Sequence, residues 1–251
     1  MRRFSFLAAG ALATACLLSG SGLQAAGLPK AVTTAVDDSA RPQADKDRDA
    51  VRKPGETIVF AGVKPGSKVL ELFPNAGYYT RILSGVVGPK GRVYAISPPK
   101  RGDRDLGADT RALAADPHYS NVTAISAAFS EIKVAEPVDV VWTTLNYHDL
   151  HNNPNLDIAA FNKAMFDLLK PGGTYFVVDH TAEAGSGVRD TQKLHRIDPA
   201  AVKAEVIAAG FKFDKQGDFL KNPDDPHKAA VFDASIRGKT DQFAMKFTRP
   251  K

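Results

Sequence analysis

Strand-length apolar runs alternate regularly with segments of helical spacing from residue 63 onward, and this alternation limits the possible folds more than any other feature. Strands are predicted at 68–73, 91–96, 121–126, 138–144, 174–178, 211–213 and 243–247. Amphipathic helices are predicted at 77–87, 103–115, 156–169 and 198–209. Helix-length connections favour parallel strands with right-handed crossovers. The chain is therefore expected to form a doubly wound, Rossmann-like α/β domain. Its sheet would be mostly parallel, with an antiparallel strand pair at the C-terminus.

The N-terminus has the organisation of an export signal. Two arginines precede an apolar stretch at 4–18, and small or polar residues follow. This order is typical of a secretory signal peptide rather than a membrane span, because the apolar stretch is short and has no stop-transfer flank. Cys16 lacks the leucine three residues earlier that a lipoprotein site usually has. We therefore expect cleavage near Ala25 or Ala26 instead of lipid anchoring at Cys16.

The predicted organisation has three parts: a signal peptide at 1–25, a flexible leader at 26–44 that is low in aromatic residues, and one α/β domain at 45–251. Such a protein would be periplasmic or secreted. The formal charge of +5 is mild, and no dense Lys/Arg run is present. The composition therefore argues against a nucleic-acid partner and leaves a small-molecule substrate as the default. No segment after the signal peptide is apolar enough to predict a transmembrane span.

The first predicted strand leads into a short loop and then a helix. The sequence there is Glu71-Leu72-Phe73-Pro74-Asn75-Ala76-Gly77. Junctions of this kind bring backbone N–H groups and a helix N-terminus to a ligand beyond the strand ends. The sequence Leu-Lys-Pro-Gly-Gly at 169–173 precedes the fifth predicted strand. In these motifs and in the order of its elements, the chain resembles the class I S-adenosylmethionine-dependent methyltransferases.

This resemblance implies S-adenosylmethionine as cofactor and methyl transfer as activity. The family's cofactor loop has an acidic residue followed by glycines at alternate positions. Here Glu71 is the acidic residue, Phe73 and Asn75 occupy the first two glycine positions, and Gly77 keeps the third. Ser97 stands where the family usually has an acid for the ribose hydroxyls, and a single hydroxyl is a weaker acceptor. An alternative thus stays open: a binding protein or metal-dependent enzyme on the same fold, with a degraded cofactor loop.

Further motifs are similar to a narrower group, the predicted bacterial methyltransferases that carry signal peptides. They are Asn146-Tyr147-His148-Asp149-Leu150-His151, Val178-Asp179-His180 and Leu194-His195-Arg196-Ile197-Asp198-Pro199. Many methyltransferases place a polar residue at the Asn146 position, against the reacting methyl or its acceptor. Asn146 is therefore assigned to the cofactor site by resemblance. The resemblance to this narrower group implies the methyltransferase fold and class, but it does not imply a substrate.

Histidines gather after the fourth and fifth predicted strands. His148 and His151 follow the fourth strand, His180 follows the fifth, and His195 lies in the next loop. Because the ends of neighbouring parallel strands lie at the same edge of a sheet, these residues are expected on one rim of the cofactor cleft.

Three roles are open for this cluster. One is general acid–base catalysis on the methyl acceptor, with an aspartate orienting a ring. Another is metal binding, and the third is hydrogen bonding between loops. The metal interpretation would use His148, His151, Asp179, His180 and His195. We predict the catalytic role, assign no metal ligand, and name His148, Asp149, His180 and His195 as catalytic.

Overall fold

The computed structural model describes Met1 and residues 27–251. Apart from Met1, the signal peptide predicted at 1–25 lies outside the described residues. Within the described part of the chain, no helix combines the length and apolar character needed to cross a membrane.

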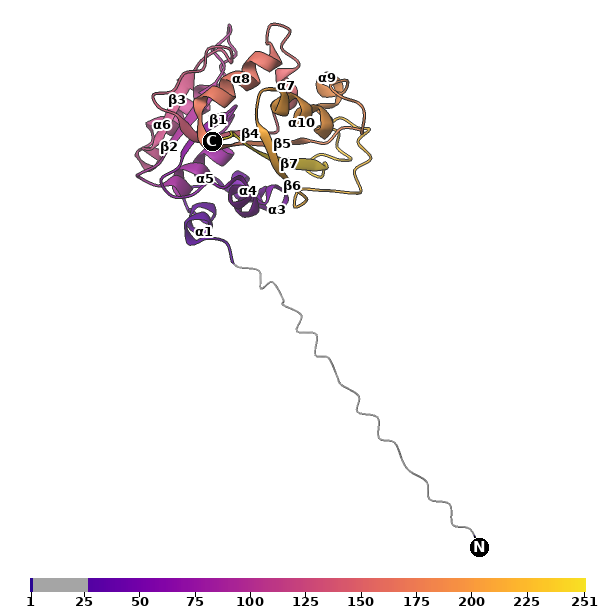
Figure 1. Ribbon diagram of the computed structural model, residues 1–251. Coiled ribbons are helices and arrows are strands. Elements are labelled where there is room, and N and C mark those ends of the chain that lie inside the picture. Colours follow the sequence, from indigo (N-terminus) through magenta and orange to yellow (C-terminus); the bar gives the residue numbers. More distant parts are fainter. Residues whose placement is uncertain (2–26) are drawn as a thin grey trace.

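The strands form one seven-stranded sheet in the order β3-β2-β1-β4-β5-β7-β6 (Figure 1). Their bounds are β1 Lys68–Leu72, β2 Arg92–Ser97, β3 Val122–Ser126, β4 Val138–Thr144, β5 Leu169–His180, β6 Lys212–Gly217 and β7 Gln242–Thr248. Strands β1 to β5 pair in parallel, whereas β7 is antiparallel to both β5 and β6. The predicted mostly parallel sheet with a C-terminal antiparallel pair is confirmed.

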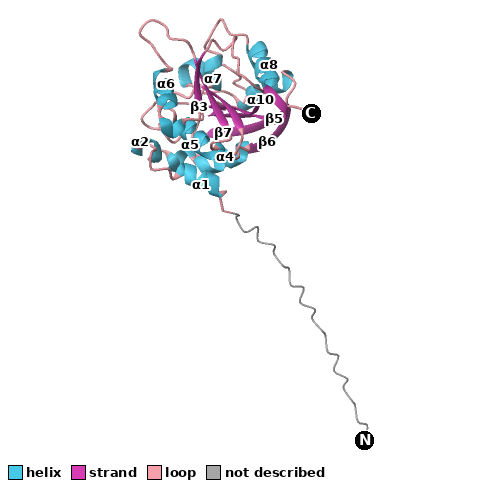
Figure 2. Cartoon of the chain, turned by 90° about the vertical axis from the view of Figure 1, so that its left-hand side faces the viewer, coloured by secondary structure: helices cyan, strands magenta, loops and turns pink. Residues whose placement is uncertain are grey.

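Helices cover both faces of this sheet (Figures 1 and 2). They are α1 Lys30–Val36, α2 Gln43–Lys46, α3 Asp49–Arg52, α4 Pro54–Ala61, α5 Tyr78–Val87, α6 Ala108–Ala115, α7 Tyr147–Leu150, α8 Ile158–Leu168, α9 Thr191–Leu194 and α10 Pro199–Ala208, with a 3₁₀ turn η1 at Pro117–Tyr119. Helices α1, α4 and α5 pack with one core cluster, and α8 and α10 with the other. A sheet with helices packed on both faces is typical of a doubly wound fold.

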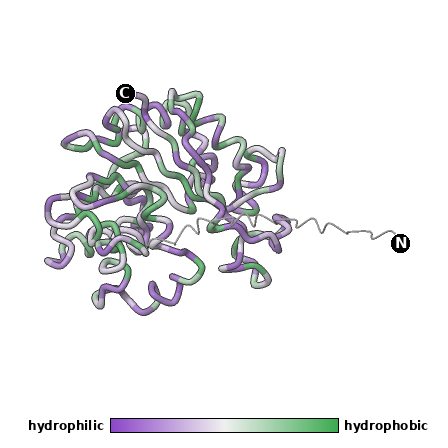
Figure 3. Tube along the Cα trace, turned by 60° about the horizontal axis from the view of Figure 1, so that its bottom comes forward, coloured by the Kyte–Doolittle hydropathy of each residue, from purple (hydrophilic) through white to green (hydrophobic). Residues whose placement is uncertain are grey.

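The two core clusters follow from the alternation of side chains along each strand. In β1, Val69 belongs to the cluster under α5, whereas Leu70 and Leu72 belong to the cluster under α8. Both faces of these strands are buried, which explains why they read as continuous apolar runs. Figure 3 shows hydrophobic segments inside the molecule and hydrophilic residues in many outer loops.

The structure differs from the flexible leader predicted at 26–44. Helix α1 lies in this segment and packs against α5, with Val32 and Ala35 both buried. A Cβ on Gly85 of α5 would come within 2.8 Å of the Ala35 Cβ, so the missing side chain permits the close approach. Further along, buried Arg41 binds Asp49 at 2.7 Å. The small alanines and the lack of aromatics concealed this packing in the sequence.

Two element boundaries also differ from the prediction. Helix α6 covers only the last part of 103–115, because Arg101 and Arg104 pair across a tight turn before it. Strand β5 begins before residue 174, since Leu169 already pairs with Val138. The intervening Pro-Gly-Gly segment bulges out of the ladder instead of ending the element.

Glu71 is a carboxyl group inside the core. Its side chain is 2% exposed, and the Thr80 hydroxyl donates a 2.6 Å hydrogen bond to it. Burial raises the pKa of Glu71 to about 7, against the Thr80 hydrogen bond, which lowers it. In the unfolded chain this carboxyl ionises near its ordinary pKa of 4.5. The folded state therefore loses relative stability as the pH rises from about 4.5 to about 7.

We predict that Glu71→Gln removes this loss of stability at higher pH. Urea unfolding of the wild type and of Glu71→Gln at pH 5 and pH 8 measures the unfolding free energy of each protein. The decrease in unfolding free energy between the two pH values should be smaller in the variant, by about 3 kcal/mol at most. Exposed Glu131 supplies a matched control, because Glu131→Gln makes the same chemical change outside the core. Equal pH dependence in the wild type and Glu71→Gln would contradict the prediction.

Candidate functional site

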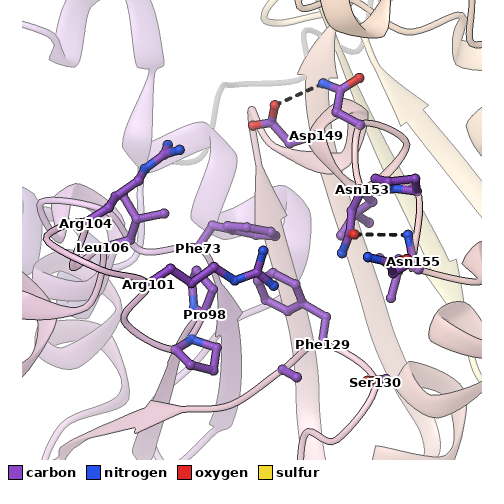
Figure 4. A pocket seen from close by; sticks show the side chains of 16 residues that line it. Phe73, Pro98, Arg101, Arg104, Leu106, Phe129, Ser130, Asp149, Asn153 and Asn155 are labelled. Atoms are coloured by element: carbon purple, nitrogen blue, oxygen red, sulfur yellow. Dashed lines mark hydrogen bonds between the residues drawn. The ribbon is translucent and has the colours of Figure 1, made fainter.

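A cavity of about 630 Å³ opens at the carboxyl ends of β1 to β4 (Figure 4). Its wall combines the segments that follow these strands: Phe73, 98–106, 128–130 and 149–156. From β1 the sheet extends to β2 on one side and to β4 on the other, so the strand order reverses at this place. Ligands of open α/β sheets bind at such a switch point. The volume is that of a small-molecule site.

The loop after β1 has a left-handed backbone at three alternate positions, although only one of them is glycine. Phe73, Asn75 and Gly77 have φ values of +52°, +50° and +80°. Glycine adopts this left-handed conformation without strain, whereas other residues do so at a cost. A Cβ on Gly77 would stand 2.7 Å from the Leu113 side chain, so glycine is needed there on two grounds. The three positions that were aligned with the family's glycines therefore all have the left-handed conformation.

Two of the predicted cofactor residues lie beneath the cavity rather than in its wall. The Ser97 hydroxyl is buried and lies 3.4 Å from the Thr110 hydroxyl, which in turn donates to the Asn75 carbonyl. The Asn146 amide donates to the Leu72 carbonyl at 3.2 Å and accepts from the Thr143 hydroxyl. These polar groups hold the strand ends together. Of the six predicted cofactor residues, Phe73 lines the cavity.

The cavity wall contains groups that the sequence analysis missed. The Phe73 ring packs on the Phe129 ring with centroids 4.1 Å apart (Figure 4). Two arginines and three asparagines also line the wall: Arg101, Arg104, Asn152, Asn153 and Asn155. The position of Phe129 three residues after a predicted strand was an available signal. The spacing of the other residues carries no recognisable motif.

The histidines predicted to be catalytic converge next to this cavity. His148, on α7, is buried, and its Nδ1 lies 2.8 Å from an oxygen of Asp179 at the end of β5. Asp179 also accepts from the backbone N–H groups of His148 and His180, each at 2.8 Å. The other ring nitrogen, His148 Nε2, lies 3.3 Å from His195 Nδ1 and 3.4 Å from Asp149 Oδ1. Asp149 lines the cavity, so it joins the cluster to the cavity wall.

The pKa shifts of His148 and His180 go in opposite directions. Burial lowers the pKa of His148, but the charge and hydrogen bond of Asp179 outweigh it and the pKa lies above its usual value. Burial alone would raise the pKa of Asp179. The charge and hydrogen bonds of His148 outweigh burial, so the pKa of Asp179 lies below its usual value. For His180, burial dominates and lowers the pKa to about 4, which leaves that ring neutral at pH 7. His148 with Asp179 has the arrangement of a general base and its orienting carboxylate.

His180 and His151 have partners outside this cluster. The His180 Nδ1 lies 2.8 Å from the Thr240 hydroxyl, and its ring centroid is 6.2 Å from that of His148. The His151 Nε2 lies 3.2 Å from Glu205. Of the four residues predicted to be catalytic, the structure therefore brings together His148, Asp149 and His195.

The loop that carries His195 is firmly anchored. His195 follows α9 in a left-handed conformation with φ +53°. Its neighbour Arg196 is fully buried and binds fully buried Asp225 at 2.8 Å. Arg196 also donates to the carbonyls of Thr181 and Ala229. These contacts hold the backbone next to His195, whose ring lies beside His148.

No protein-family model matches the chain, and no curated protein matches it. Solved structures do resemble it. A SAM-dependent methyltransferase from Aquifex aeolicus superposes with a TM-score of 0.59 at 20% identity, over 83% of this chain and 98% of that one. The glycopeptide N-methyltransferase MtfA, solved with S-adenosylmethionine, gives 0.54 at 15% identity over 78% and 86%.

The [4+2]-cyclase SpnF also resembles this chain, with a TM-score of 0.55 at 14% identity over 82% of this chain and 81% of that one. Similarity at this level of identity establishes the fold. The cavity of this chain lies at the switch point of that fold. The chain has the fold of the class I S-adenosylmethionine-dependent methyltransferases.

Proposed function

We propose that this protein binds S-adenosylmethionine and transfers its methyl group to a small-molecule acceptor in the cell envelope. The observation that carries the proposal is the cavity of about 630 Å³ beside the left-handed loop after β1. A methyltransferase with this fold was solved with the same cofactor. Bound S-adenosylmethionine supplies a methyl group on a sulfonium, ready for attack by a nucleophile.

The residues of the site fit this cofactor, with substitutions for the usual groups. Phe73 and Phe129 offer aromatic faces to a nucleobase. The asparagine side chains in the wall can accept hydrogen bonds from ribose hydroxyls, which the buried Ser97 cannot reach. Phe73, Asn75 and Gly77 all have the left-handed backbone that glycine adopts without strain. This backbone supports the proposal that the loop after β1 approaches the cofactor, although two of the three side chains are not glycine.

The acceptor side of the cavity is assigned to the histidine cluster. Asp149 belongs both to the cavity wall and to the contact with His148. A base at His148, oriented by Asp179, would take the proton that an attacking hydroxyl or amine loses. The size of the cavity favours a small acceptor over a macromolecular one.

One observation favours a second candidate function, a different reaction on the same fold. Ser97 replaces the usual ribose-binding acid and makes its contact with Thr110, inside the protein. The similarity to a [4+2]-cyclase illustrates that this fold carries other chemistry. Binding of the cofactor distinguishes the two functions.

The first test of the proposal is calorimetric titration of S-adenosylmethionine and S-adenosylhomocysteine into the purified chain. Ala128 lines the cavity, so Ala128→Trp should fill it and weaken binding by about tenfold or more. Ala184 is exposed and outside the cavity wall, and Ala184→Trp should leave binding unchanged. Absence of binding in a protein that unfolds cooperatively would favour the second candidate function.

The aromatic wall gives a second prediction. Stacking of a base on an aromatic ring contributes roughly 1–3 kcal/mol. We therefore expect Phe129→Ala to weaken S-adenosylhomocysteine binding by about tenfold, and Phe129→Leu to restore only part of the loss, because leucine keeps apolar volume without a π face. The same calorimetric titration measures both variants. Full affinity in Phe129→Ala would rule out stacking at this wall.

The envelope location rests on the N-terminal export pattern. When the full chain is expressed in a bacterium with two membranes, it should appear in the periplasm as a shortened form. Sequencing of its N-terminus should read from Ala26 or Gly27. A matched chain without residues 2–25 should stay in the cytoplasm. Unshortened full chain confined to the cytoplasm would contradict the proposed location.

A further inference from the structure

We propose that His148, Asp149 and His195 form a binding site for a divalent transition-metal ion at the edge of the cavity. Their ligand atoms, His148 Nε2, Asp149 Oδ1 and His195 Nδ1, lie within 4.8 Å of one another. Two imidazole nitrogens and one carboxylate oxygen form a common donor set for catalytic metals. The site goes beyond methyl transfer and does not depend on the cofactor.

Two of the three distances between the ligand atoms fit a tetrahedral ion, and the third is slightly longer. The distances are 3.3 Å between the two imidazole nitrogens, and 3.4 and 3.8 Å from these nitrogens to Asp149 Oδ1. With metal–ligand distances of about 2.0–2.2 Å, two corners of a tetrahedron lie roughly 3.3–3.6 Å apart. Imidazole ligands favour Zn²⁺ and its neighbours over Mg²⁺ or Ca²⁺. We therefore assign the site to Zn²⁺ first.

The contact of His148 with Asp179 also has the form found at metal sites. Metal-binding histidines commonly give their other ring nitrogen to a carboxylate, which fixes the tautomer. Asp179 has this position for His148: its side chain is fully buried and its oxygen lies 2.8 Å from Nδ1. When Asp179 accepts the proton of Nδ1 and an ion displaces any proton from Nε2, the Nε2 lone pair is available on the side of His195 and Asp149.

The backbone around His195 supports the same assignment. A left-handed histidine is uncommon, and such strain is often found at functional sites. The buried Arg196–Asp225 ion pair holds the backbone of this loop in place before any ion binds. A preformed ligand set reduces the ordering cost of binding.

Three protein ligands leave a fourth coordination position for water or a substrate oxygen. Because Asp149 also lines the cavity, the ion would stand at the cavity wall. With an ion bound, His148 acts as a ligand and not as the proton acceptor. The metal itself would then lower the pKa of a coordinated hydroxyl or water.

The test is calorimetric titration of Zn²⁺ into chelator-treated full chain from which any affinity tag has been cleaved. One Zn²⁺ per chain should bind. Asp149→Asn keeps the side-chain shape and should weaken binding by ~10-fold or more, since it removes a charged ligand. His195→Asn tolerates the left-handed backbone and should weaken it similarly. Co²⁺ in place of Zn²⁺ should give an absorption spectrum of a tetrahedral site, which both variants should lose.

Matched controls come from the exposed pair His118 and Asp38, whose side chains lie 2.7 Å apart outside the cluster. His118→Asn and Asp38→Asn should bind Zn²⁺ like the wild type. The metal site would be overturned if the folded protein does not bind Zn²⁺. It would also be overturned if Asp149→Asn and His195→Asn bind Zn²⁺ as tightly as the wild type does. Either result leaves the S-adenosylmethionine titration as a separate test of the proposed function.

Discussion

The buried carboxylate of Asp179 is the interaction on which the candidate site depends. It lies at the end of β5 with no exposed surface, and it accepts from the His148 ring and from two backbone N–H groups. A buried charge without such partners would cost several kcal/mol, so these contacts are required once the aspartate is there. They fix α7 against β5. Their consequence for chemistry is that His148 presents one defined nitrogen, Nε2, toward His195 and Asp149.

The sheet made most of this arrangement predictable from sequence. Parallel strands buried on both faces read as continuous apolar runs, and the carboxyl ends of such strands meet at one edge. That rule alone placed His148 and His195 in the same region. It could not distinguish them from His151 and His180, because the choice depends on which way each side chain points. Partners far apart in sequence, such as Glu205 for His151 and Thr240 for His180, decide this.

The cofactor loop shows a different limit of sequence reasoning. The substitutions Phe73 and Asn75 suggest a degraded loop, yet the backbone keeps the left-handed conformation at both positions. Hydrogen bonds below the loop explain how non-glycine residues hold it, since the Asn75 carbonyl accepts from Thr110 and the Asn146 amide donates to the Leu72 carbonyl. Motif matching compares residue types. The conformation here depends on contacts that connect the loop to α6 and to the segment between β4 and α7.

Asp149 gives the cavity and the histidine cluster a common group. Its carboxylate contacts His148 and His195 on one side, and its residue forms part of the cavity wall on the other. A proton-transfer site and a metal site place different demands on this residue. A base at His148 needs Asp149 only as a neighbouring charge, whereas a metal needs its oxygen as a direct ligand. The distances of 3.4 and 3.8 Å from Asp149 Oδ1 to the two imidazoles are close to those between ligands of one ion, and they are the geometric basis of the metal proposal.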